Sequence, residues 1–433
     1  MVDSRDSGAV HDVLIVGAGA AGLWCAQALG QARSASGAER LSVVVLEKTP
    51  RTGTKVLASG GTRCNVTTTH GPDEAARLFG TRGERFLRHA FRELTPQAVR
   101  AQFEDWGVPM AEAPLDKIFP AEGNARDVRD ALEAAARAVA EIRLGSEVKS
   151  IGRDGDAWAV RVADGSVHRG RALVLAAGGK SYPLTGTTGD AYPWLRELGL
   201  DVVDPVPALV PLASPEGWVH ELTGLAWQGG EAQLENGEGK VLQRRRRPLL
   251  FTHKGISGPA AMDVSHHVAR EAEEHGAASG YRIRFDFYPH LEREEIRAEL
   301  VKAAGMPGNP RLQKAIARLA MGPMPRRMFD AVALKADVDP GVTVGALQKS
   351  QRHAFVETLK GLSIEVTHPL GWDQAEVTAG GLNLKALNPR TMAVNGHDGL
   401  FVIGELLDVN GPIGGLSFQA AFATAELAAR ALA

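Results

Sequence analysis

Three glycines near the start of the chain have the spacing of a phosphate-binding turn. They lie in the run Gly17-Ala18-Gly19-Ala20-Ala21-Gly22. The first glycine permits a tight turn, the second lets a phosphate approach the backbone, and the third lets a helix pack closely on a strand. The spacing predicts a site for a cofactor's pyrophosphate. The alternative is a glycine-rich turn that holds no ligand.

The segments around this turn read as a strand and a helix. Asp12–Val16 is a short apolar run typical of a buried parallel strand, and good helix formers extend from Ala20 to about Leu29. The helix dipole and free N–H groups would then point at the pyrophosphate. A second strand, Leu41–Leu46, ends in Glu47, whose carboxylate is placed to accept ribose hydroxyls. Together these elements predict an α/β, Rossmann-type domain that binds a dinucleotide.

A polar, basic and glycine-dense segment follows, from Arg51 to Thr67, with neither helical nor strand periodicity. Lys55 and Arg63 are candidates to neutralise phosphates, and the amides of Ser59–Gly61 could form an anion-binding nest. A simple surface loop is the alternative.

The bulk properties exclude several classes of protein. The 433 residues suffice for two or three domains, and the formal net charge of -2 creates no field that would recruit nucleic acid or an acidic membrane. Cys25 and Cys64 are the two cysteines, so we expect no disulfide framework and a reducing, cytoplasmic setting. We expect no membrane span, because no apolar run approaches about 20 residues.

Five later blocks resemble one known family in the family's own order. They are Gly53–Thr67, Ala176–Asp190, Leu250–Pro259, Ala375–Gly381 and Gly404–Gly415. Together with the glycine turn they resemble the bacterial flavoprotein family known as aminoacetone-oxidase-like. Two positions depart from it: Thr62 stands where a third glycine is expected, and Asn410 where members often carry Asp.

The resemblance implies FAD, held by a Rossmann domain of the two-dinucleotide-binding-domain type that a β-barrel-like and a helical subdomain interrupt. The predicted boundaries are residues 1–190 with 374–433 for the FAD domain, 191–290 for the β-barrel-like domain, and 291–373 for the helical subdomain. The FAD should be non-covalent, because no histidine or cysteine lies in a recognised flavin-linking motif.

The predicted cofactor contacts combine the glycine turn with residues that the resemblance implies. They are Gly17, Ala18, Gly19, Ala20, Ala21, Gly22, Glu47, Lys48, Lys55, Ser59, Gly60, Gly61, Arg63, Cys64, Asn65, Val148, Ala177, Gly178, Gly179, Asp190, Gly404, Glu405, Asp408, Gly414, Gly415 and Leu416. Glu405 ends a strand where related flavoproteins place an acid on the ribityl hydroxyls. The alanine-rich helix Leu416–Leu432 would aim its positive end at the flavin pyrimidine.

Four side chains are catalytic candidates. Lys180 and Tyr182 follow the glycines at 178–179 and could orient a substrate carbonyl, the alternative being a charge pair and a packed ring. His253 and Lys254 lie between glycine-containing turns, where a satisfied loop histidine is the commoner case. Cys64 is more simply structural than a catalytic thiol.

The leading functional hypothesis is an FAD-dependent oxidoreductase that reduces an activated C=C bond. The resemblance implies either uridine in ribosomal RNA or an enone small molecule as substrate. The Arg244–Arg247 run modestly favours RNA, although such runs are usually solvated. NAD(P)H would visit transiently, since no second GxGxxG follows a strand, and no metal-binding spacing is present. The alternative is a flavin-carrying binding protein, ribosome-associated, with structural FAD. The sequence assigns no oligomeric state.

Overall fold

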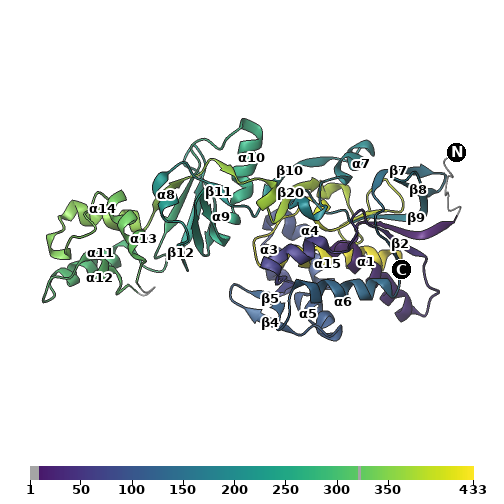
Figure 1. Ribbon diagram of the computed structural model, residues 1–433, viewed down its shortest axis with the longest axis horizontal. Helices are drawn as coiled ribbons and strands as arrows, with labels where there is room; N and C mark the ends of the chain where they lie inside the picture. The colour runs from purple at the N-terminus through teal and green to yellow at the C-terminus, as the bar shows by residue number, and fades with distance from the viewer. Residues whose placement is uncertain (1–8, 320–322) are drawn as a thin grey trace. The chain divides into compact units, whose positions relative to one another are not determined.

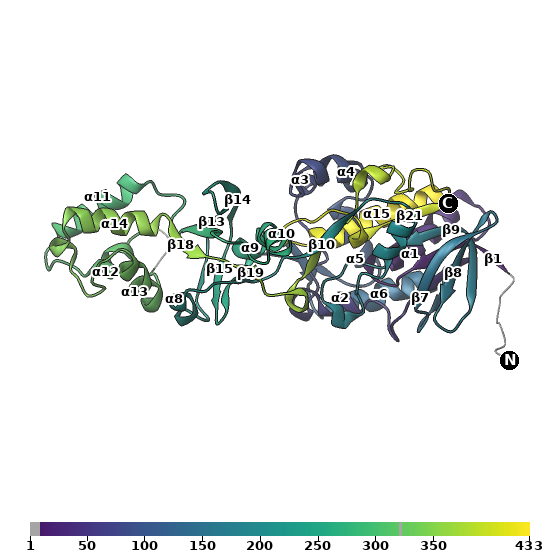
Figure 2. The same cartoon turned by 90° about the horizontal axis from the view of Figure 1, so that it is seen from above.

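The computed structural model describes residues 9–319 and 323–433. These residues form two compact units (Figure 1). Unit 1 comprises Met1–Val206 and Ala375–Ala433, and unit 2 comprises Pro207–Gln374. Unit 2 is thus one continuous segment, and unit 1 contains the first and the last described segments of the chain, purple and yellow in Figure 2.

A seven-stranded sheet forms the centre of unit 1, in the order β6-β2-β1-β9-β8-β7, with β21 also paired to β9. β2, β1, β9, β6 and β21 run parallel, and β7, β8 and β9 pair antiparallel. The parallel part contains buried apolar runs, such as all of β2 and the last four residues of β9, and such runs are typical of strands covered on both faces. The strands are β1 (Val10–Val16), β2 (Val43–Leu46), β6 (Glu141–Arg143), β7 (Val148–Asp154), β8 (Ala157–Val162), β9 (Val167–Leu175) and β21 (Leu400–Val402).

Two long helices from opposite ends of the chain pack together in unit 1. Helix α1 (Ala20–Ser36) extends beyond the helix formers that end at about Leu29, and its C-cap, Gly37, has the left-handed conformation. Helix α15 (Leu416–Leu432) has the predicted bounds. The rings of Trp24 and Phe422 lie 4.6 Å apart between them. The other helices of unit 1 are α2 (Thr54–Ala58), α3 (Pro72–Arg77), α4 (Gly80–Glu93), α5 (Pro96–Asp105), α6 (Ala125–Arg137) and α7 (Ala191–Glu197).

Unit 1 also contains two smaller sheets. Strands β3 (Thr67–Thr68), β5 (Lys117–Pro120) and β4 (Met110–Ala113) form one of them. Strand β10 (Val202–Ala208), which leads into unit 2, pairs with β20 (Val377–Leu382), which follows the return from it. These two strands therefore mark where the chain leaves unit 1 and re-enters it.

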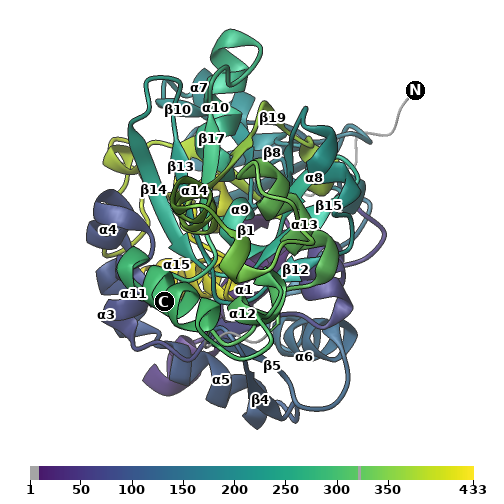
Figure 3. The ribbon, with the colours of Figure 1, turned by 90° about the vertical axis from the view of Figure 1, so that its left-hand side faces the viewer.

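Unit 2 begins with two antiparallel sheets (Figure 3). The first has the order β12-β15-β16-β11-β19, and the second has the order β14-β13-β17-β18. Their strands are β11 (Leu212–Ala213), β12 (Ala226–Trp227), β13 (Glu231–Glu235), β14 (Val241–Arg246), β15 (Leu249–Thr252), β16 (Gly255–Ser257), β17 (Arg282–Asp286), β18 (Leu362–Glu365) and β19 (His368–Pro369).

The helices of unit 2 share one hydrophobic core with these strands. Phe285 of β17 and Phe329 and Phe355 of the later helices are fully buried in it. The helices are α8 (Gly217–Glu221), α9 (Pro259–Met262), α10 (Ser265–His275), α11 (Arg293–Ala304), α12 (Leu312–Ile316), α13 (Arg326–Lys335) and α14 (Lys349–Leu359). Across the described residues of both units, no helix is long and apolar enough to cross a bilayer.

Candidate functional site

The turn between β1 and α1 has the backbone geometry that its glycines predict. Gly17 has φ +104°, and a Cβ there would lie 2.5 Å from the carbonyl oxygen of Ala176. A Cβ on Gly22 would lie 1.9 Å from the Gly17 oxygen, so this glycine permits close packing of helix on strand. A Cβ on Gly19 would meet nothing within 4 Å. Two glycines are therefore required by packing, while the third faces open space.

The N-terminus of α1 offers its backbone to a ligand. Its N-cap, Gly19, provides no side-chain hydrogen bond, and the first turn carries no acidic residue. The Ala18 N–H donates to Glu47 Oε2 at 2.7 Å, which brings the predicted ribose-binding carboxylate to the turn. The Ser146 N–H donates to the Glu47 carbonyl oxygen at 2.8 Å, so the start of β7, with Val148, lies beside the same strand end. This arrangement suits an anion that carries a ribose.

Lys48 and Asp190 contact each other. Lys48 Nζ lies 2.5 Å from Asp190 Oδ2 and 2.7 Å from Thr188 Oγ1. The pair joins the end of β2 to the loop at 176–190. It therefore holds two of the predicted cofactor segments side by side.

A second ion pair joins Lys55 to Glu405. Lys55 Nζ lies 2.6 Å from Glu405 Oε2 and 2.6 Å from Ser181 Oγ. Glu405 Oε1 also accepts from Ser181 Oγ at 2.9 Å and from the Thr378 N–H at 2.8 Å. The carboxylate, which the sequence predicts for the ribityl hydroxyls, is thus fixed by three segments far apart in the chain.

Ser181 and Thr378 are polar residues that our sequence reading did not select. Both are fully buried, and Thr378 Oγ1 accepts from the N–H groups of Lys180 (2.8 Å) and Ser181 (3.2 Å). A Cβ on Gly179 would lie 2.2 Å from Thr378 Oγ1, which explains the glycine. In the sequence, these two residues are marked only by lying in the blocks Ala176–Asp190 and Ala375–Gly381, because an isolated Ser or Thr has no diagnostic pattern.

The segment expected to be an irregular loop contains α2 and then a tight turn, Ser59–Thr62. Gly60, Gly61, Thr62 and Cys64 all have positive φ. The Arg63 guanidinium lies 4.7 Å from the centre of the Phe119 ring, and Asn65 Oδ1 accepts from the Ile118 N–H. A phosphate-neutralising role for Arg63 stays a prediction.

Burial makes Cys64 an unreactive thiol. Its side chain is 1% exposed, and burial raises its pKa to about 12. Cys25 is also fully buried, and burial raises its pKa further. Both groups are therefore neutral thiols near pH 7, which excludes thiolate chemistry in the folded protein.

The C-terminal blocks supply a second helix N-terminus. Gly415 is the N-cap of α15, has φ +80° and provides no side-chain cap. A Cβ there would lie 2.1 Å from the Thr67 oxygen. The buried Leu416 follows it, and Gly404 donates its N–H to Thr424 Oγ1 at 3.1 Å. Asp408 forms an ion pair with Arg82, with 2.8 Å between Asp408 Oδ2 and Arg82 Nη1.

The four catalytic candidates divide between the units. Lys180 and Tyr182 flank the buried Ser181 in unit 1; Tyr182 is 38% exposed and has φ +58°. His253 and Lys254 are exposed at the turn between β15 and β16 in unit 2. The structure therefore brings Lys180 and Tyr182 together on one loop, and His253 and Lys254 on another.

The sequence profile of the family described as "HI0933-like protein Rossmann domain" matches residues 11–431. The chain belongs to this family.

Two relatives align with the HI0933-like chain over nearly its whole length. It is 28% identical over 422 residues to the ribosomal RNA dihydrouridine synthase of Escherichia coli (strain K12), covering 97% of this chain and 98% of the relative. It is 28% identical over 426 residues to the 3-dehydro-bile acid delta(4,6)-reductase of Clostridium scindens, with the same coverage. The narrower aminoacetone-oxidase-like label stays a prediction.

A solved structure has a similar fold. The 3-ketosteroid delta1-dehydrogenase from Sterolibacterium denitrificans superposes with a TM-score of 0.52 at 14% identity, covering 98% of this chain and 99% of that chain. The HI0933-like chain therefore has a Rossmann-type α/β fold.

FAD fits the residues present in unit 1. The open space at Gly19 and the uncapped N-termini of α1 and α15 provide backbone donors without a competing side chain. Glu47 and Glu405 are the carboxylates that would hold its hydroxyls. Over the described ranges, no group of three His, Cys, Asp or Glu residues could hold a metal ion.

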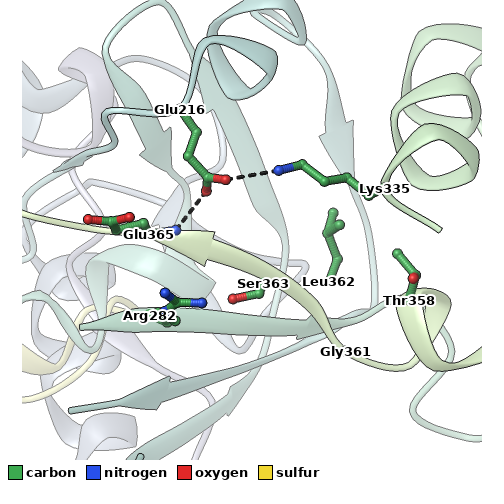
Figure 4. Close-up of a pocket in the computed structure, with 8 residues that line it drawn as sticks. All are labelled: Glu216, Arg282, Lys335, Thr358, Gly361, Leu362, Ser363 and Glu365. Carbon is green, nitrogen blue, oxygen red and sulfur yellow. Dashed lines mark hydrogen bonds and ion pairs between the residues drawn. The ribbon is translucent and has the colours of Figure 1, made fainter. Parts of the chain in front are cut away.

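A polar pocket in unit 2 is lined by residues that are not among the predicted site residues (Figure 4). Its volume is about 270 Å³, and Glu216 is central to it. That carboxylate accepts from Lys335 Nζ at 3.0 Å, the Glu365 N–H at 2.8 Å and Trp218 Nε1 at 2.8 Å. Burial alone would raise the pKa of Glu216, but these three donors outweigh burial and lower it. The carboxylate is therefore an ionised structural anchor.

Proposed function

We propose that the HI0933-like chain is an FAD-dependent reductase that adds a hydride and a proton across a C=C bond conjugated to a carbonyl. One observation carries this proposal. Two relatives of equal identity and coverage are named for the synthesis of dihydrouridine in ribosomal RNA and for the delta(4,6) reduction of a 3-dehydro-bile acid. A uracil ring and a 3-oxo-4,6-diene share a double bond conjugated to a carbonyl.

The reaction requires hydrogen-bond donors at the acceptor's carbonyl oxygen. Reduced FAD supplies the hydride when bound, and negative charge then develops on that oxygen. We assign the Lys180 ammonium and the Tyr182 hydroxyl to this role in unit 1. They are also our candidates to deliver the proton that completes the product. His253 and Lys254 of unit 2 remain candidate donors.

The loop that carries Lys180 and Tyr182 is fixed on both sides of Ser181. Thr378 Oγ1 accepts from the N–H groups of Lys180 and Ser181, and Ser181 Oγ donates to Glu405. After Ser181, the Thr185 N–H donates to the backbone carbonyl oxygen of Tyr182 at 3.0 Å. A donor on a fixed backbone needs little reorganisation during the reaction, which supports a catalytic role.

We favour uridine in ribosomal RNA over an enone small molecule. The Arg244–Arg247 run provides cationic groups on unit 2 that a neutral small molecule would not need. NAD(P)H is the proposed transient electron donor, and a reaction on ribosomal RNA would take place in the cytoplasm.

Reoxidation of the pre-reduced protein tests this proposal. The protein is reduced anaerobically and mixed with ribosomal RNA or with a simple enone, while flavin absorbance and dihydrouridine content are measured. We expect at least one acceptor to oxidise the flavin and the double bond to disappear stoichiometrically. Oxidation by neither acceptor at any salt concentration would reject the reductase and leave a flavin-carrying binding protein with structural FAD.

Variants then separate the donors. Lys180→Ala, Tyr182→Phe and His253→Ala should slow reoxidation without releasing FAD. Lys149→Ala is the matched control, because Lys149 is an exposed lysine of β7 that pairs with Glu147. A variant that reoxidises as fast as the parent protein does not carry a donor.

A further inference from the structure

Tyr192 lies in the first turn of α7 and carries a buried hydroxyl. The residue is 3% exposed, and within the described residues Tyr192 Oη has no hydrogen-bond partner. Buried polar atoms are normally paired, and each exception needs an explanation, such as a catalytic role or a bound water or ion. A phenylalanine would fill the same space without an unpaired oxygen. The hydroxyl therefore suits a hydrogen-bond partner that does not belong to the chain.

The ring that carries this hydroxyl lies among the predicted cofactor segments. A Cβ on Gly189 would lie 3.0 Å from Tyr192 Cδ2 and 3.6 Å from the Cβ of Lys180. The Tyr192 N–H donates to the Gly189 carbonyl oxygen at 3.1 Å, which fixes the start of α7 against this glycine. A Cβ on Gly179 would in turn lie 3.0 Å from Glu405 Oε1. The ring therefore lies beside the loop that also borders the Glu405 carboxylate.

Two carboxylates act electrostatically on the Tyr192 hydroxyl. Burial raises its pKa above the ordinary value for tyrosine, and the charges of Glu405 and then Asp408 raise the pKa further. Arg196 acts in the opposite direction and is the smallest of these causes. The hydroxyl therefore stays protonated at neutral pH, and a protonated phenol has one O–H to donate. Tyr192 is thus a neutral donor near two predicted cofactor residues.

Glu405 has little capacity left for a cofactor. Its Oε1 accepts from Ser181 Oγ and the Thr378 N–H, and its Oε2 accepts from Lys55 Nζ. These donors occupy most of the about four lone-pair sites of a carboxylate. Glu405 can therefore accept about one more hydroxyl, whereas the ribityl chain of FAD carries several. Another polar group is needed to complete a ribityl site at this carboxylate.

We propose that Tyr192 is a further cofactor-binding residue, whose hydroxyl donates to an oxygen of the FAD ribityl chain beside Glu405. This assignment rests on the proposed function, which takes FAD as the cofactor of unit 1. A ribityl hydroxyl that donates to Glu405 keeps lone pairs on its oxygen, and the Tyr192 O–H is a donor for them. The carboxylate and the phenol thus act on the same chain as a complementary acceptor and donor.

The chain offers a matched pair of variants to test this contact. Tyr192→Phe removes a single oxygen and keeps the ring. Tyr288→Phe removes the same atom in unit 2, where Tyr288 is fully buried and its hydroxyl is also unpartnered within the described residues. All predicted cofactor residues belong to unit 1, so Tyr288→Phe controls for the loss of a buried hydroxyl. FAD is titrated into the FAD-free, full-length proteins, and flavin fluorescence gives the dissociation constants.

We expect Tyr192→Phe to bind FAD about tenfold more weakly than the parent, the effect of one lost hydrogen bond, and Tyr288→Phe to bind FAD like the parent. Without FAD, the Tm of neither variant should fall, because each loses an unpaired buried oxygen. An unchanged FAD affinity in Tyr192→Phe, or equal weakening in both variants, would overturn the proposal. A lower Tm of FAD-free Tyr192→Phe alone would also overturn it, because the hydroxyl would then have a partner without FAD.

Two further measurements use the purified holoprotein. Tyr192→Phe alone should release FAD about tenfold faster than the parent. The absorbance spectrum of bound FAD should be the same in Tyr192→Phe and the parent, because the ribityl chain is not part of the chromophore, and a shifted spectrum would overturn the ribityl assignment. A parent protein that binds FAD but reduces no acceptor would reject the proposed reductase and leave the Tyr192 contact in place.

Discussion

The glycine turn of unit 1 and the ion pairs of Asp263 in unit 2 both place charge inside the fold, but by different physical means. At the turn the positive potential comes from backbone N–H groups at an uncapped helix end, and no formal charge is buried. At Asp263 the charges are on side chains, and its buried carboxylate lies 3.7 Å from Arg245 Nε and 3.9 Å from Arg247 Nε. The first arrangement depends on a few neighbouring residues, whereas the second depends on the packing of separate elements. Their responses to substitution should therefore differ.

Gly19→Val should produce the largest effect, a complete loss of bound FAD in a folded protein. Gly19 has φ -81° and open space around its Cβ position, so the fold accepts valine, but the side chain fills the phosphate's place. Absorbance of purified protein measures FAD, and Tm measures folding. Gly152→Ala on β7, another glycine with an open Cβ position and ordinary φ, should stay yellow. A yellow Gly19→Val protein would contradict the assignment of the turn.

Asp263→Ala should destabilise unit 2 by about 2–4 kcal/mol, because the partly buried guanidinium groups of Arg245 and Arg247 lose a buried carboxylate within ion-pair distance. The estimate stays at the lower end because both arginines keep some exposure to solvent. Urea denaturation measures the change, and Glu238→Ala on an exposed turn is the control. If Asp263→Ala lowers the free energy of unfolding no more than Glu238→Ala does, the Asp263 ion pairs contribute little to stability.

Thr62→Gly should stabilise unit 1 by about 1 kcal/mol. Thr62 has φ +72°, a conformation that costs a β-branched residue about 1–2 kcal/mol and glycine almost nothing, although glycine loses more entropy on folding. The same denaturation experiment measures this change. A destabilised Thr62→Gly protein would mean that the threonine side chain, rather than backbone geometry, decides stability here.

The smallest expected effect concerns the two cysteines, which we expect not to react with an alkylating reagent in the native protein. Cys64, with its pKa raised to about 12 by burial, should not react with iodoacetamide in the native protein at pH 8, and neither should Cys25. Both thiols should react once the protein is denatured. Rapid labelling of native Cys64 would show that this thiol is accessible and reactive in the folded protein, which would contradict the prediction.

The sequence predicted elements whose signals are local. Helix α15 has its predicted bounds because an alanine-rich run begins directly after Gly414 and Gly415. Helical periodicity over residues 84–103 favours a single helix, but the structure has α4 and α5 there. Thr95 caps the second helix by accepting from the Ala98 N–H, and Pro96 occupies its first turn. This Thr-Pro signal was present in the sequence but was outweighed by helical periodicity.

Tertiary partners could not be predicted in this way. Residues 141–150 have a strand-like pattern, but they contribute to β6 and β7, at opposite edges of one sheet, because Gly145 turns the chain with φ +68°. Asp263 lies far from the arginines in sequence and follows an ordinary apolar stretch. Thr378 has no residue pattern that would link it to Lys180. Such pairs arise when separate elements pack, and a single sequence contains no signal for them.

The order in which unit 1 is assembled has a consequence for biosynthesis. Strand β21 and helix α15 complete the sheet and the helix pair, yet they leave the ribosome only after all of unit 2. At about 5–20 residues per second, the nascent glycine turn waits on the order of 20–80 s for these partners, because roughly 400 residues separate them. During translation, unit 2 is complete before unit 1 can close around its cofactor. Nascent chains arrested near Tyr192 or within unit 2 should therefore carry no flavin, and loading should be post-translational.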